Sequence, residues 1–120
     1  MSEFITTNVT VHTDVIMQKV ENAIHDEGVM TQVHQAFAEI IDPWIPYDTG
    51  NLSQDITVSA ECVTYNADYA SIQYYETEFN HKREHHPLAT AYWDKVAMQT
   101  EKERLAREAS EIVKRRLKNG

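Results

Sequence analysis

"PYDTGNLSQDITVSAECVTYN" (residues 46–66) places a turn directly before two short stretches of residues that are typical of strands. The chain has only three glycines, and one of them stands in this cluster of turn-forming residues. Such a cluster predicts a tight turn with at least one residue at positive φ. The following runs are rich in β-branched residues and are joined around Ala60 and Glu61, which predicts a β-hairpin. The turn would aim this hairpin, and its residues are Pro46, Asp48, Thr49, Gly50 and Leu52.

The segments before the turn carry two different hydrophobic periods. Apolar and polar side chains alternate through residues 4–11, which predicts a half-buried strand. Apolar residues then recur at spacings of three and four through residues 14–41, which predicts a long helix capped by Thr13 or Asp14. Gly28 weakens the middle of this helix and marks a point at which it could split.

The second half of the chain predicts a sheet followed by another helix. After a turn over residues 43–51, we expect strands within residues 52–75. The stretch "ADYASIQYYE" (67–76) fits either a third strand or a short helical turn. Residues 76–87 are polar and without a period, which indicates a loop, and residues 88–117 show the pattern of a long final helix.

These patterns indicate an α+β fold, in which a small antiparallel β-sheet packs with a long N-terminal helix and a long C-terminal helix. At 120 residues, we expect a single domain over residues 1–120. The single Cys62 excludes an internal disulfide and favours a reducing compartment. The first residues lack the pattern of a signal peptide, and no stretch is apolar enough to predict a membrane span.

Charge is distributed unevenly along the chain. The net charge of −8 argues against general affinity for nucleic acid, because phosphate binding depends on Lys and Arg. Residues 101–120, however, hold seven of the eleven basic residues and four of the nineteen acidic ones. The first hundred residues therefore hold four basic and fifteen acidic residues. The chain has an acidic body and a basic C-terminal segment, which is either a solvated helix or a contact for an acidic partner.

Three groups of side chains could carry chemistry, and none has a convincing pattern. His81, His85 and His86 lie in one short loop and could bind zinc or nickel if it folded back on itself, although Pro87 argues against a helix there. Carboxylates that could act as acid and base have no fixed separation, and the cysteine fits a buried strand residue. The carboxylates considered for acid–base chemistry are Asp42, Asp48 and Asp55. We expect no catalytic residue, no cofactor and no metal site.

Aromatic side chains gather in the second half of the chain. They fit packing in the core, and they equally fit a subunit interface, where amphipathic rings are enriched. Together with the basic side chains of the C-terminal segment, they form a set of candidate interface residues. This set is Tyr69, Tyr74, Tyr75, Trp93, Arg107, Lys114, Arg115 and Arg116.

Three motifs in order resemble one protein family. The turn "P-x-x-T-G-x-L", the pair Tyr69–Ala70 and the late motif "HHPLATAYWDKVA" (85–97) are similar to minor capsid and head–tail connector proteins of long-tailed bacteriophages and prophages, relatives of a tail-completion family. The match covers roughly residues 43–100. Two positions differ from the family pattern: Asp55 or a neighbouring residue stands where a Ser is usual after the turn, and Glu76 and Thr77 stand where a glycine often follows the Tyr-Ala segment.

The resemblance implies a structural virion protein, assembled in the host cytoplasm, several copies of which form a ring at the neck between portal and tail. Its partners would be further copies, portal or adaptor proteins and tail proteins. DNA would pass nearby without specific binding, which an acidic body favours by repulsion, and no membrane is involved. Two alternatives stay open: an adaptor or regulatory domain using the basic C-terminal helix, and a small metal-dependent enzyme using the His81–His86 loop.

Overall fold

A computed structural model describes residues 8–46, 51–67, 70–75 and 88–119. It shows an α+β fold with a small three-stranded sheet and a long C-terminal helix, as the sequence predicts. The elements are β1 (Val9–Val11), α1 (Val15–Ala23), α2 (Glu27–Ile41), the 3-10 turn η2 (Asp42–Trp44), α3 (Asn51–Gln54), β2 (Ile56–Val58), β3 (Val63–Tyr65), α4 (Ala70–Tyr75) and α5 (Trp93–Asn119).

The sheet has the strand order β1-β3-β2, and both pairings are antiparallel. The hairpin of β2 and β3 is confirmed, since Val58 pairs with Val63 and the Ser59 N–H donates to the Cys62 carbonyl at 2.9 Å. β1 adds to the other side of β3, with Val11 opposite Val63. One face of the sheet therefore carries apolar side chains into the core.

The other face of the sheet carries a row of threonines. Thr10, Thr64 and Thr57 lie opposite one another across the three strands. Thr10 and Thr57 are exposed, and the hydroxyl oxygens of Thr10 and Thr64 are 3.2 Å apart. This face is polar because strand residues alternate between the two sides of a sheet.

The predicted helix over residues 14–41 is wrong as one element, because it is two helices. α1 ends at Ala23 and the chain is extended at Ile24, with φ −156° and ψ 131°. α2 restarts after Asp26, whose side chain accepts a hydrogen bond from the Val29 N–H at 3.0 Å. The break is set by this N-cap rather than by Gly28, which lies inside the first turn of α2.

Two further predicted boundaries are corrected. Among the described residues of 52–75, only β2 and β3 are strands, and Asn51–Gln54 is helical. Ala70–Tyr75 is helical too, which is one of the two conformations expected for residues 67–76. The final helix begins at Trp93 rather than at residue 88, because Tyr92 has a left-handed backbone with φ 49° and ends the preceding loop. Residues 4–7 of the predicted first strand and the loop 76–87 lie outside the described residues.

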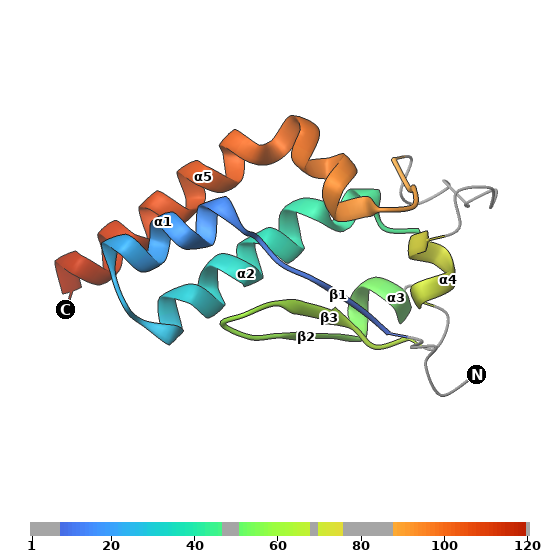
Figure 1. Cartoon of the computed structure of the whole chain (residues 1–120), viewed down its shortest axis with the longest axis horizontal. Helices are drawn as coiled ribbons and strands as arrows, with labels where there is room; N and C mark the ends of the chain where they lie inside the picture. The colour runs from blue at the N-terminus through green and yellow to red at the C-terminus, as the bar shows by residue number, and fades with distance from the viewer. Residues whose placement is uncertain (1–7, 47–50, 68–69, 76–87, 120) are drawn as a thin grey trace.

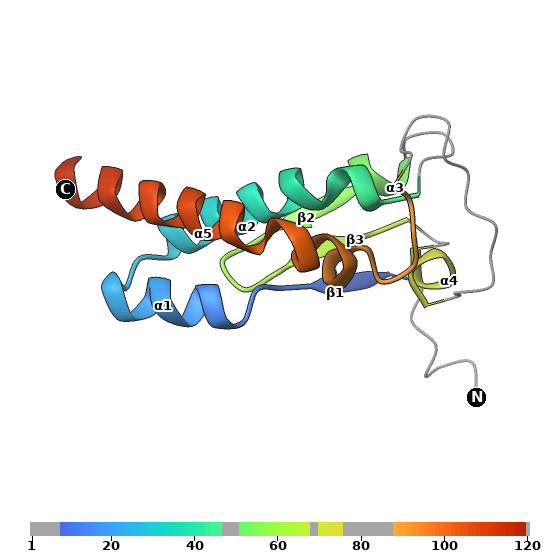
Figure 2. The ribbon, with the colours of Figure 1, turned by 90° about the horizontal axis from the view of Figure 1, so that it is seen from above.

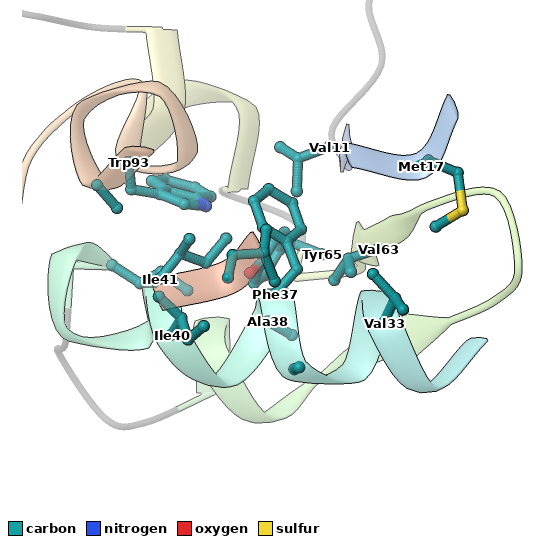
Figure 3. Packing of buried hydrophobic residues seen from close by; sticks show 14 of the residues in the cluster. Val11, Met17, Val33, Phe37, Ala38, Ile40, Ile41, Val63, Tyr65 and Trp93 are labelled. Atoms are coloured by element: carbon teal, nitrogen blue, oxygen red, sulfur yellow. The ribbon is translucent and has the colours of Figure 1, made fainter. Parts of the chain in front are cut away.

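α2 lies between the sheet and α5, with α1 beside α5 (Figures 1 and 2). Because α2 has neighbours on two sides, it buries eight of its fifteen residues. Phe37 of α2 is at the centre of the core, with Trp93 and Ile41 toward one end and Val33 toward the other (Figure 3). This packing fixes both the sheet and the first half of α5 relative to α2.

His34 is a buried polar group in this core. It lies on α2, has no exposed surface, and its Nε2 accepts a hydrogen bond from the Thr13 N–H at 3.3 Å. The contact joins the link between β1 and α1 to α2. Burial lowers the pKa of His34 from its ordinary value, with a smaller lowering from His12 and opposing contributions that include Glu61. The neutral ring is favoured because protonation would also remove the acceptor for Thr13.

We expect the free energy of unfolding to decrease as the pH falls below about 6.5, the ordinary pKa of histidine. The folded pKa of His34 lies below that value, so the unfolded state binds its proton first and gains stability. Urea denaturation at neutral and mildly acidic pH measures this loss.

The matched variants are His34→Gln and His25→Gln, because His25 is exposed. His34→Gln should reduce the pH-dependent part of the loss and His25→Gln should leave it unchanged. Equal pH dependence in wild type and His34→Gln would mean that other groups cause it.

Candidate assembly surface

An aromatic cluster joins α4, β3 and the start of α5. The Trp93 ring lies edge-to-face against Tyr65, with ring centroids 5.3 Å apart, and against Tyr74 at 4.8 Å. Tyr74 also contacts Tyr75 at 4.9 Å and Tyr92 at 5.1 Å. Such contacts contribute beyond the burial of area alone. The cluster therefore holds the short helix α4 against α5.

A buried hydrogen bond reinforces this cluster. The Tyr74 hydroxyl donates to Oδ1 of Asp94 at 2.5 Å, and both side chains are buried. Asp94 lies in the first turn of α5, where the helix dipole favours a negative charge. Burial raises the pKa of Tyr74 far above its ordinary value, and the bond to Asp94 raises it further. Tyr74 therefore stays protonated and acts as a donor.

Tyr92 turns the chain from the preceding loop into α5. Its φ of 49° is in the left-handed region, which is unusual for a bulky residue and costs roughly 1–2 kcal/mol. Two backbone bonds hold it: its N–H donates to the Tyr74 carbonyl at 2.8 Å, and its carbonyl accepts from the Val96 N–H at 3.0 Å. The aromatic cluster and the start of α5 are therefore one connected unit.

The predicted interface aromatics divide into two groups. Trp93 has no exposed surface and Tyr74 is 5% exposed, so both are core residues and have no surface to offer a partner. Tyr75 is 58% exposed and stays a candidate contact. Tyr69 lies outside the described residues.

The predicted turn is described only at its ends. Pro46 and Leu52 are both buried, which anchors the two sides of the turn in the core. Asp48, Thr49 and Gly50 lie outside the described residues, so the predicted positive φ stays a prediction.

The basic candidates lie on the second half of α5 and are all exposed. Arg116 is held within the chain, because its Nε donates to the Asp26 carboxylate at 2.9 Å. Lys114 lies 3.9 Å from Glu111 on the same helix. Arg107 and Arg115 line a groove between α2 and α5 with a volume of about 760 Å³.

The N-cap residue Asp26 was not among the residues singled out from the sequence, although it joins distant parts of the chain. Its carboxylate caps α2 through the Val29 N–H and pairs with Arg116 near the C-terminal end of α5. These two contacts lower its pKa, the bond from Val29 more than that from Arg116. An Asp directly before a helical pattern is a sequence signal for the cap. No sequence signal indicated that Arg116, ninety residues away, would pair with it.

A scan against protein-family models matches a family described as minor capsid protein over residues 7–110. This chain belongs to the minor capsid protein family. The match covers most of the sequence, including α1 and the segment before the predicted turn, which the sequence motifs did not reach. The family makes the chain a structural phage virion protein. No curated protein and no solved structure matches it.

The described part of this minor capsid protein holds no group of three or more His, Cys, Asp or Glu side chains that could bind a metal ion. The loop His81–His86 lies outside that part. Cys62 is half-buried, with its Sγ 3.7 Å from the Ser59 hydroxyl and 3.8 Å from the Thr64 hydroxyl. Among the described helices, none is long and apolar enough to cross a membrane.

Tyr74→Phe should destabilise the minor capsid protein by about 1–3 kcal/mol, because the buried Asp94 carboxylate loses a hydrogen-bond donor. Tyr75→Phe is the matched control on the same helix: its ring is largely exposed, and we expect a change within about 0.5 kcal/mol. Chemical denaturation of both variants measures the difference. Equal effects would show that the bond to Asp94 contributes nothing.

Asp26→Ala should lower the melting temperature more than Asp26→Asn, because Asn still caps α2 and only the ion pair with Arg116 is lost. Arg116→Gln should resemble Asp26→Asn. Because the pKa of Asp26 is lowered in the folded chain, its contribution is present above the ordinary value of 3.8 and is lost in stronger acid. Identical melting temperatures of the Ala and Asn variants would show that the Asp26 cap does not stabilise α2.

Proposed function

We propose that this minor capsid protein is a head–tail connector or tail-completion subunit, several copies of which form a ring at the neck between portal and tail. One observation carries the proposal. The last turns of α5 extend past the ends of α1 and α2 (Figure 2), and residues 114–119 are all exposed. This end of α5 is free to contact a neighbouring subunit or protein.

The charge of this end fits an acidic neighbour. Lys114, Arg115, Arg116 and Lys118 stand within five residues, with no acidic residue among them. The first hundred residues have fifteen acidic and four basic side chains, so this part of every further copy carries an excess of negative charge. Opposite charges on two parts of one molecule favour a head-to-tail contact, because each copy then has one surface of each kind.

Head-to-tail contacts close into rings when the rotation between neighbours allows it. An acidic ring also suits a neck, since DNA that moves through it should not bind to its wall. Negative side chains repel phosphate and so leave the DNA free to pass without specific contacts. In the proposed role the further partners are portal or adaptor proteins on one side and tail proteins on the other, and assembly takes place in the host cytoplasm.

The role is non-enzymatic and needs no cofactor. Support comes from the family, from the three motifs that resemble connector proteins, and from the use of Tyr74 and Asp94 as a packed structural pair rather than as an open site. Tyr75 and the basic end of α5 are the candidate contacts that remain exposed.

Electron microscopy of an induced lysate from a strain that lacks this gene tests the role. We expect full heads and finished tails that are not joined, because a neck subunit is missing. Normal joined particles would contradict the neck position, and the absence of heads would point to a role earlier in capsid assembly.

Complementation with variants tests the basic end of α5. Arg115→Glu/Lys118→Glu should fail to restore joined particles, because the contact with an acidic neighbour becomes repulsive. The control Arg115→Lys/Lys118→Arg keeps both charges and should restore them. Full complementation by the charge-reversed chain would exclude this end as the contact.

A further inference from the structure

A second groove lies on the other side of α5, between α5 and α1. It has a volume of about 560 Å³, within the ~300–1,000 Å³ range of ligand sites. Its lining is largely apolar, although part of it faces solvent: Val15 is 58% exposed and Ala106 is exposed. An apolar surface of this kind outside the core commonly marks a contact with another molecule.

The rim of this groove is basic, whereas the first hundred residues of the chain have an excess of acidic side chains. Lys19, Lys102 and Lys114 line it, against the single carboxylate of Glu103. Within the described residues, neither Lys19 nor Lys102 has a carboxylate at ion-pair distance, whereas Lys114 lies near Glu111. The chain as a whole has a net charge of −8, so the groove differs from the overall charge of the protein, as the basic end of α5 also does.

The groove between α2 and α5 provides a comparison. Its charged lining is balanced, with three acidic side chains and three basic ones: Glu39, Glu108, Glu111, Arg107, Lys114 and Arg115. Side chains of opposite charge there can neutralise one another. The α1–α5 groove has three lysines and one glutamate, so a bound molecule with acidic side chains would complement its charge.

The walls of the α1–α5 groove decide the backbone conformation of its occupant. Both walls are α-helices, whose N–H and C=O groups are already paired within each helix. An extended segment would find no backbone partners there, unlike a segment added to a sheet edge. A helix satisfies its own backbone and can place one apolar face between two others.

We propose that the α1–α5 groove binds an amphipathic helix of a partner protein, with its apolar face on the groove floor and acidic side chains at the lysine rim. The occupant is a helix of another protein, because the lysine rim fits acidic side chains; filling of the groove by a second copy is the outcome that the sedimentation experiment below would reveal. The proposal does not depend on the neck role, because the groove is a property of the single subunit.

The probe is a fluorescent peptide of about 18 residues, ~27 Å long as a helix, with Leu at spacings of three and four and Glu on the opposite face. Anisotropy with the full-length chain measures binding. We expect binding that weakens as salt is raised to about 0.5 M. A peptide of the same composition with its Leu residues scattered, and one with Lys in place of Glu, should not bind.

Matched variants locate the site. Lys102→Glu should weaken binding about tenfold or more, whereas Arg104→Glu makes the same charge change on α5 outside this groove and should not. Ala106→Glu places a larger charged side chain in the groove and should prevent binding; Gln32→Glu is its control on α2. All four positions are exposed and helical, and circular dichroism checks that each variant folds.

The proposal would be overturned if the wild-type chain did not bind, if the scattered peptide bound equally well, or if Lys102→Glu and Arg104→Glu weakened binding equally. Sedimentation of the unliganded chain tests the other occupant. A dimer that Ala106→Glu alone converts to a monomer would show that a second copy fills the groove, which would also overturn it. Joined particles in the gene-deletion lysate would contradict the neck role and leave this binding result unaffected.

Discussion

The packing of α2 on two sides is the constraint on which the rest of the structure depends. Its residues face the apolar side of the sheet in one direction and α5 in the other, and Phe37 and Ile41 are almost completely buried. A sheet with three-residue strands would be marginal without such a partner. α5, in turn, buries side chains at intervals from Trp93 to Val113, which leaves only its last turns fully exposed. The same packing thus accounts for the core and for the exposed basic end.

The hairpin and the overall α+β arrangement could be predicted because their signals are local. Alternation and β-branched residues mark β2 and β3, and Ser59–Cys62 is a short turn between them. A split of the helix over residues 14–41 was considered only at Gly28, because apolar spacing continues across Ile24, while the deciding feature is a cap at Asp26. α4 and the late start of α5 depend on Tyr74, Tyr92 and Trp93 meeting in space, which no local pattern records.

The candidate surface shows the same division. That residues 101–120 are basic is visible in the composition, and the structure leaves that end exposed. Which side chains remain available for partners depends on contacts between distant segments. Arg116 forms an ion pair with Asp26. Trp93 and Tyr74 are buried in the core, whereas Tyr75, the neighbour of Tyr74, is exposed. The α1–α5 groove could not be predicted, because it requires knowing that Lys19 and Lys102 lie on facing helices.

The threonine face and the short strands of the sheet affect the tendency of the protein to aggregate. β1 and β2 are both edge strands, and each spans three residues. An edge this short offers few free backbone groups to a further strand. Stacking of one sheet on another would bury little apolar area, because the outer face is polar. These two features protect the protein against fibrous aggregation. Within the described residues, this leaves the side chains of the helices as the surface for contacts with other molecules, where charge can make a contact selective and reversible.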